Sequence, residues 1–126
     1  MTQKDKELLL KDLCARLPYG LKVKCEEYSF PVTILYSGNI DEVKFKETGG
    51  IENICTIKPY LFPLSSMTEE EQRTLDSMCN GVEMVSRLSG LKMFDKAFNW
   101  LDETHFDYRG LIEKGLAIDA TGKNIY

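Results

Sequence analysis

The sequence predicts an α+β domain in which one helix precedes a small antiparallel sheet and further helices follow it. Apolar residues recur at helical spacing near the start, alternate with polar ones in short runs over about residues 21–61, and return to helical spacing over about 68–116. The 126 residues are 43% hydrophobic and 29% charged, which is typical of one globular core. A chain of this length buries roughly 65% of its unfolded surface, so we expect one domain over residues 1–126 without disulfide or metal support.

The first helix is predicted from about Gln3 to Leu17. Thr2, with Asp5 three positions later, is a near relative of the capping box that begins many helices. Leucines and a cysteine follow at three- and four-residue spacing: Leu9, Leu10, Leu13, Cys14 and Leu17. The helix should end at Pro18 and Gly20, because proline disfavours helical geometry in the residue before it and glycine readily takes a positive φ.

Four short strands should follow. The predicted runs are Leu21–Cys25, Val32–Tyr36, Val43–Lys46 and Ile54–Ile57, each bounded by turn residues, with Pro59 stopping the last. Together they predict a four-stranded antiparallel meander, either as a sheet with one covered face or as a small half-barrel of the SH3 type. Periodicity does not choose between these two forms.

The remaining segments read as a connector and helices. Residues 58–66 should form an extended apolar connector, and Thr68 with Glu71 forms a capping box that predicts a helix over Glu69–Cys79. Residues 82–88 read as a short helix or irregular structure. Asp107 should cap a last short helix over Tyr108–Lys114 that ends in a Schellman motif at Gly115. A core helix before it is predicted from Met93, Phe94, Ala97, Phe98, Trp100 and Leu101.

The net charge of −4 is unevenly distributed. Residues 1–24 carry +3, residues 25–66 carry −3 and residues 67–126 carry −4. The pI of about 5.1 disfavours general binding of DNA or RNA, which usually requires a strongly basic domain. A local basic patch remains as a candidate contact for phosphate, made of Lys4, Lys11, Arg16, Lys22 and Lys24.

The cysteines and the apolar runs argue against metal sites, disulfides and membrane spans. Cys14, Cys25, Cys55 and Cys79 are widely spaced, and a single histidine is available to complete a metal site. We therefore expect reduced thiols, no metal and no cofactor. No apolar run approaches the ~20 residues of a membrane span, and no secretory signal is visible, so the expected location is the cytoplasm.

The residues that most resemble a catalytic group are His105, Asp107 and Arg109, with Tyr108 between them. An imidazole, a carboxylate and a guanidinium so close together offer acid–base chemistry. A structural interpretation is favoured, because Asp107 is explained as a helix cap and the sequence contains none of the common phosphate-loop, hydrolase or zinc-protease motifs.

Aromatic residues in or beside the strands suggest a binding surface. The candidates are Tyr28, Phe30, Tyr36, Tyr60 and Phe62. Some must fill the core, but they exceed what a four-stranded sheet needs, so an exposed patch for a peptide or protein is a reasonable expectation. The alternative is a well-filled core with tyrosines at its edge.

Three stretches of the sequence read KDLCARLPYGLKVKC, IKPYLFPLSSMTEEE and FNWLDETHFDYRGLIEKGLAIDA. They resemble a family of small uncharacterised proteins from phages, prophages and mobile elements of Bacteroides and related gut bacteria. The resemblance implies an accessory protein of bacterial or phage origin and carries no activity or site residue. Our leading hypothesis is a non-enzymatic module that binds another protein, of host or phage. The alternatives are a nucleic-acid accessory protein that uses the basic N-terminal region and an enzyme centred on His105, Asp107 and Arg109.

Overall fold

The computed structural model describes residues 2–39, 42–79 and 96–126. Within them, residues 96–103 are also helical, and three short 3-10 turns occur at Leu17–Tyr19, Ile54–Thr56 and Leu64–Ser66. The remaining elements are α1 (Gln3–Arg16), β1 (Lys22–Cys25), β2 (Val32–Asn39), β3 (Glu42–Phe45), β4 (Ile51–Asn53), β5 (Ile57–Pro63), α2 (Glu69–Cys79), β6 (Phe106–Asp107) and β7 (Ile118–Asp119). The expected α+β class is confirmed.

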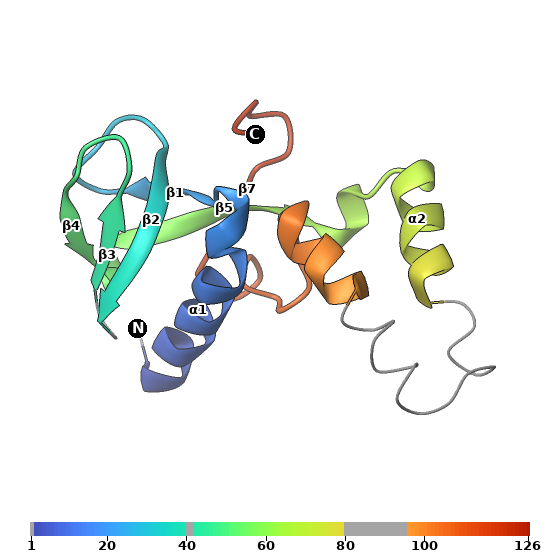
Figure 1. Ribbon diagram of the computed structural model, residues 1–126, viewed down its shortest axis with the longest axis horizontal. Coiled ribbons are helices and arrows are strands. Elements are labelled where there is room, and N and C mark those ends of the chain that lie inside the picture. Colours follow the sequence, from blue (N-terminus) through green and yellow to red (C-terminus); the bar gives the residue numbers. More distant parts are fainter. Residues whose placement is uncertain (1, 40–41, 80–95) are drawn as a thin grey trace.

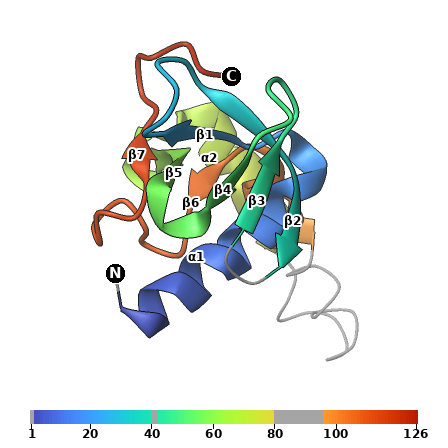
Figure 2. The same ribbon diagram turned by 90° about the vertical axis from the view of Figure 1, so that its left-hand side faces the viewer.

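The strands form one open, mixed sheet of seven strands in the order β4-β3-β2-β1-β5-β6, with β7 also pairing with β5 (Figure 2). The antiparallel pairs among β1 to β4 form the expected meander, and β5 pairs antiparallel with β1 on its other side. β6 and β7 add short parallel pairings to β5, with Phe62 opposite Phe106 and Tyr60 opposite Ile118. The sheet therefore has seven strands where the sequence predicted four, and β6 and β7 were missed because two-residue strands leave no periodic signal.

Helix α1 begins and ends as predicted. Asp5 N–H donates to Thr2 Oγ1 at 3.1 Å and Thr2 N–H donates to the Asp5 carboxylate at 3.4 Å, so the capping box forms. Gly20, at φ 68°, ends the turn that follows. The helix packs against the sheet (Figures 1 and 2) and joins a single apolar core. Its members are Leu9, Leu13, Leu21, Val23, Cys25, Val32, Ile34, Val43, Phe45, Ile54, Ile57, Leu61, Leu111, Leu116 and Ala117.

The prediction of a strand over Ile54–Ile57 was wrong. The Asn53 side chain accepts a hydrogen bond from Cys55 N–H at 2.8 Å and folds residues Ile54–Thr56 into a 3-10 turn. The fourth strand of the meander is instead β4, immediately before this turn. A side chain that hydrogen-bonds the backbone two residues later competes with strand pairing, and this overrides the β-branched composition.

The predicted connector over residues 58–66 was also partly wrong, since most of it is strand β5. Pro59 does not stop the strand, although proline cannot donate a backbone hydrogen bond. It pairs with Val23 of β1, while β7 begins its pairing with β5 only at Tyr60. Pro59 therefore occupies a position where β5 has an open side, which is where a sheet tolerates proline.

Helix α2 forms over the predicted range. Thr68 N–H donates to Glu71 Oε1 at 3.0 Å and Glu71 N–H donates to Thr68 Oγ1 at 3.1 Å, which completes its capping box. In the helix over 96–103, Ala97 and Leu101 are buried as expected, but Phe98 is 47% exposed and does not belong to the core. The predictions for residues 82–88, Met93 and Phe94 concern positions outside the residues that the structure describes.

The last predicted helix, over Tyr108–Lys114, does not form. Gly110 has φ 75°, which interrupts helical geometry, and residues 111–115 are turns. The Schellman motif at Gly115 is nevertheless present, because Leu116 N–H donates to the Leu111 carbonyl at 2.9 Å and Gly115 N–H to the Ile112 carbonyl at 3.1 Å.

The structure describes the thiols of three of the four cysteines. Cys25 is buried, and Cys14 and Cys55 are exposed; all three are free. Across residues 2–39, 42–79 and 96–126, no helix is both long and apolar enough to cross a membrane. In the same ranges, no three histidine, cysteine or acidic side chains are grouped so that they could hold a metal ion.

Candidate functional site

A pocket of about 300 Å³ opens beside the end of β5, and we call it the aromatic pocket. Its walls come from β5, the turn after it, α2, the segment 104–106 and the C-terminal segment. The lining residues are Phe62, Ser66, Glu71, Thr104, Phe106, Thr121 and Gly122. Pockets that bind small ligands usually span about 300–1,000 Å³, so this one suits a single side chain or a small molecule.

The apolar part of the pocket belongs to a row of aromatic rings. Phe62 and Phe106 have ring centroids 6.1 Å apart, and Trp100 stacks on Phe106 at 5.8 Å. On the other side, Tyr126 lies 6.0 Å from Phe62 and stacks on His105 at 3.9 Å. These five residues form what we call the aromatic row, and the contacts among their rings hold the two rings of the pocket in place.

Two of the three hydroxyl groups of the pocket, those of Ser66 and Thr104, already donate their protons inside the protein. Ser66 Oγ donates to the Pro63 carbonyl at 2.7 Å, and Thr104 Oγ1 donates to the Trp100 carbonyl at 2.7 Å. The Glu71 carboxylate uses Oε1 to accept from Thr68 N–H. Since each hydroxyl has one proton and two lone pairs, Ser66, Thr104 and the Glu71 carboxylate offer acceptors to the pocket.

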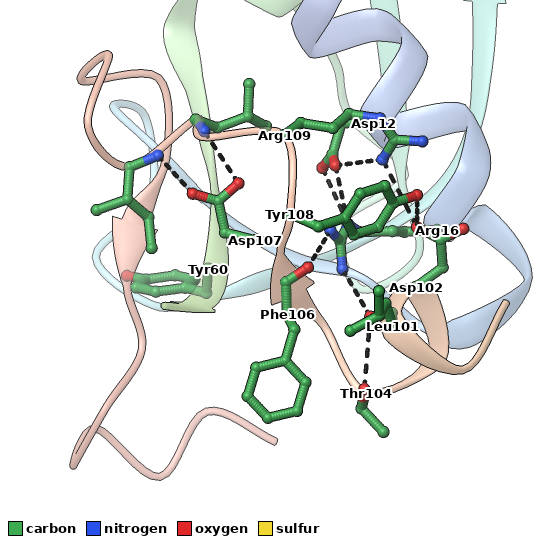
Figure 3. Close-up of polar contacts among 12 residues, drawn as sticks. Asp12, Arg16, Tyr60, Leu101, Asp102, Thr104, Phe106, Asp107, Tyr108 and Arg109 are labelled. Carbon is green, nitrogen blue, oxygen red and sulfur yellow. Dashed lines mark hydrogen bonds and ion pairs between the residues drawn. The ribbon is translucent and has the colours of Figure 1, made fainter. Parts of the chain in front are cut away.

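A buried ionic cluster, made of Asp12, Arg16, Asp102, Tyr108 and Arg109, fixes the segment that carries Thr104 and Phe106 (Figure 3). Arg16 lies in α1 and is fully buried. Its Nε donates to both Asp12 oxygens at 3.1 and 3.0 Å, its Nη1 to the Leu101 carbonyl at 3.2 Å, and its Nη2 to the Phe106 carbonyl at 2.6 Å. One side chain thus ties α1 to two backbone positions beside the pocket.

The other members of the ionic cluster neutralise one another. Arg109 Nη1 donates to Asp12 Oδ1 at 2.7 Å and lies 3.6 Å from Asp102 Oδ1. Tyr108 donates its hydroxyl proton to Asp102 at 2.7 Å, and its ring lies 4.4 Å below the Arg109 guanidinium. Burial and the bond to Asp102 raise the pKa of Tyr108 to about 12, so it stays protonated at neutral pH. Two carboxylates balance two guanidinium groups, and the cluster carries no net charge.

His105 is held in an unusual conformation beside the pocket. Its φ is 63°, a left-handed value that is uncommon for residues other than glycine, and its side chain is 5% exposed. Nδ1 is buried without a hydrogen-bond partner. Burial, followed by the charge of Arg16, lowers the pKa of His105 to about 4, although a hydrogen bond with the Tyr19 backbone opposes the shift. The imidazole is therefore neutral at physiological pH.

The predicted catalytic residues have separate partners. The Asp107 carboxylate accepts from Leu111 N–H and Ile112 N–H, each at 2.9 Å, so it caps the turn after β6 (Figure 3). Arg109 is engaged by Asp12 and Asp102, while the His105 ring stacks on Tyr126. Each of the three side chains thus has a structural contact of its own.

The predicted aromatic residues fall into two groups. Tyr28 packs on Phe45 and on Phe30, which is 48% exposed, at the meander end of the molecule. Phe62 lines the aromatic pocket, and the Tyr60 carbonyl accepts the Tyr126 hydroxyl proton at 2.8 Å. The Tyr36 side chain is not among those that the structure describes.

The predicted basic patch loses one member. Arg16 is fully buried in the ionic cluster and does not reach solvent, because a guanidinium with four neighbouring acceptors is better satisfied inside. Lys4, Lys11 and Lys24 are exposed and Lys22 is half-buried. Lys24 stands opposite Lys58 across the β1–β5 pair.

Several residues of the pocket gave no sequence signal. Thr104 and Thr121 lie in turns, and the sequence assigns no role to Phe106. Tyr126 was assigned no role, yet its hydroxyl accepts from Lys22 N–H at 3.0 Å as well as donating to Tyr60. Their proximity arises from pairings between residues distant in the chain, and only Phe62 and the capping role of Glu71 were singled out beforehand.

Comparison with known proteins adds no assignment to this geometry. No protein-family model, no curated protein and no solved structure matches the chain.

Proposed function

We propose that this chain is a non-enzymatic protein-interaction module, and that the aromatic pocket binds one side chain of an extended segment from another protein. The observation that carries the proposal is the pairing of the Phe62 and Phe106 rings with polar groups turned towards the same hollow. Apolar walls with a few placed polar groups are typical of recognition pockets. The resemblance to phage and prophage proteins supports an accessory role, with a host or phage protein as partner.

Two other hollows are less suited to this role. One, of about 230 Å³, lies on β1 and β5 and has no aromatic side chain in its lining, which consists of Lys24, Glu26, Cys55, Thr56, Lys58 and Ile118. The other, of about 310 Å³, lies beside Leu64 and Tyr108. The aromatic pocket alone among these three is walled by two phenylalanine rings. In this proposal the meander, which we expect to resemble an SH3-type half-barrel, supports the elements that form the pocket.

The test is a selection of peptides from a random library displayed on phage, with the purified full chain as bait. We expect enriched peptides that bind the unmodified protein and lose binding to Thr121→Tyr, which adds bulk at an exposed position of the pocket wall. Phe62→Ala should weaken the same peptides, because burial of a ligand against an aromatic ring is lost.

The matched control is Ser65→Tyr, which adds the same ring at an exposed position in the neighbouring hollow. Phe30→Ala removes an exposed aromatic side chain at the meander end. Both variants should retain peptide binding. Enriched peptides that bind Thr121→Tyr as well as the unmodified protein would rule out the aromatic pocket as the recognition site, and a selection without enrichment would count against the module itself.

A further inference from the structure

We infer that the side chain recognised by the aromatic pocket is an arginine, an inference that rests on the proposed function. The first reason is the direction of the hydrogen bonds. Ser66 and Thr104 donate their hydroxyl protons to backbone carbonyls, so they offer lone pairs to a ligand. A ligand that complements Ser66, Thr104 and the Glu71 carboxylate must supply donors, and a guanidinium has five donors and no acceptor.

The second reason is charge. Glu71 lines the pocket, and Glu69 and Glu70 precede it in the first turn of α2. The nearby guanidinium groups of Arg16 and Arg109 are neutralised inside the ionic cluster by Asp12 and Asp102. The fixed charge at the pocket wall is therefore negative, and it outweighs the partial positive charge at the helix N-terminus.

The third reason is the shape of the walls. Phe62 and Phe106 provide ring surfaces, which attract a cation placed over them. A guanidinium is planar and weakly hydrated, so it stacks on aromatic faces better than the compact ammonium group of lysine. The volume of about 300 Å³ suits one long side chain rather than a larger ligand.

The test compares two short peptides by NMR titration of the ¹⁵N-labelled full chain. Both are acetylated and amidated pentapeptides with two glycines on each side of a central residue, which is arginine in one and citrulline in the other. Citrulline keeps the shape but lacks the charge. We expect the arginine peptide to shift the amides of Thr104, Thr121 and Gly122 and to bind about tenfold more tightly than the citrulline peptide, since a hydrogen bond to a charged group adds roughly that factor.

The charge of Glu71 is tested by Glu71→Gln, which keeps the capping box because glutamine serves at this position as well as glutamate does. We expect it to weaken the arginine peptide about fivefold and to leave the citrulline peptide unchanged. The matched control is Glu70→Gln. It removes the same charge at the preceding position, where the side chain does not line the pocket. It should change the arginine peptide less than about twofold, as expected for a screened charge.

The outcomes separate this inference from the proposed function. Equal binding of the two peptides at the pocket would overturn the arginine inference and leave the module intact. Absence of shifts at Thr104, Thr121 and Gly122 with either peptide would also overturn the inference, while library peptides that still require the pocket would preserve the proposed function. Equal losses in Glu71→Gln and Glu70→Gln would show a general field effect and remove Glu71 as the recognising group.

Discussion

Asp12 carries a buried negative charge between the guanidinium groups of Arg16 and Arg109. Its replacement in Asp12→Asn leaves the buried Arg16 and the half-buried Arg109 with one remaining carboxylate, Asp102, at 3.6 Å from Arg109. Breaking a buried pair by removing one partner costs about 3–5 kcal/mol, so the free energy of unfolding should fall by that order. Urea unfolding followed by circular dichroism measures the change.

The control for Asp12→Asn is Glu69→Gln. Glu69 and Arg73 also form an i,i+4 pair, at 3.6 Å, but their side chains are 94% and 78% exposed. Exposed pairs contribute little because water screens them, so the urea midpoint of this variant should not move measurably. Similar midpoints for both variants would contradict a stabilising role for the ionic cluster.

His105 should make the stability depend on pH in a defined window. Its pKa is about 4 in the folded protein, against an ordinary value of 6.5. Between these values the unfolded chain binds a proton that the folded chain does not, so stability is lost as the pH falls from 6.5 towards 4. The shift corresponds to a loss of about 3 kcal/mol.

The measurement is urea unfolding between pH 4 and pH 7 for the unmodified protein and for His105→Asn. Asparagine tolerates the left-handed conformation that His105 adopts, and it does not titrate. The carboxylates contribute equally to both proteins, so the difference between the two pH profiles isolates the imidazole. Parallel pH profiles would show that burial of His105 does not cause the loss of stability at acidic pH.

At the scale of single elements, helix α2 depends on its capping box. Thr68→Ala removes the hydroxyl that accepts from Glu71 N–H, and loss of such a cap costs about 1 kcal/mol. We expect faster amide exchange over the first turn of α2. Thr74→Ala is the matched substitution inside the same helix, where alanine has the higher helix propensity and should be neutral or slightly stabilising. Equal exchange rates in the two variants would contradict the cap.

The elements that were predicted correctly are those whose signals are local. The capping boxes at Thr2 and Thr68 and the Schellman motif at Gly115 are set by residues within five positions of one another. Predictions failed where one residue changed the local geometry. Asn53 converts an expected strand into a turn, and Gly110 interrupts an expected helix. Composition alone does not reveal either effect.

The candidate site was largely beyond the reach of the sequence because distant residues form it. Arg16 contacts Leu101 and Phe106, which lie 85 and 90 positions away. Its place in an amphipathic helix predicted a surface cation, whereas the long-range carbonyls make burial favourable. Phe62 was predicted as a binding residue, but its partner Phe106 approaches it only through the parallel pairing of β5 with β6.

At the scale of the whole molecule, these long-range contacts predict that α1, the sheet and the segment around Phe106 unfold as one unit. The apolar core joins α1, the meander and the turn after β6, and the ionic cluster ties α1 to the segment around Phe106. The Tyr126 hydroxyl further connects β1 and β5 through Lys22 and Tyr60. Contacts that cross from one end of the sequence to the other oppose independent unfolding of either half.

The test uses two probes that report on different parts of the chain. Trp100, the single tryptophan, reports by fluorescence on the segment beside the aromatic pocket, while far-ultraviolet circular dichroism reports on all helices and strands. One cooperative unit requires the two urea transitions to coincide in midpoint and slope. If tryptophan fluorescence changes at a lower urea concentration than circular dichroism, the segment around Phe106 opens before the sheet, and the ionic cluster does not couple them.

The variant Asp12→Asn supplies the internal check. When the cluster is what joins the two parts, this variant should separate transitions that coincide in the unmodified protein, whereas Glu69→Gln should leave them together.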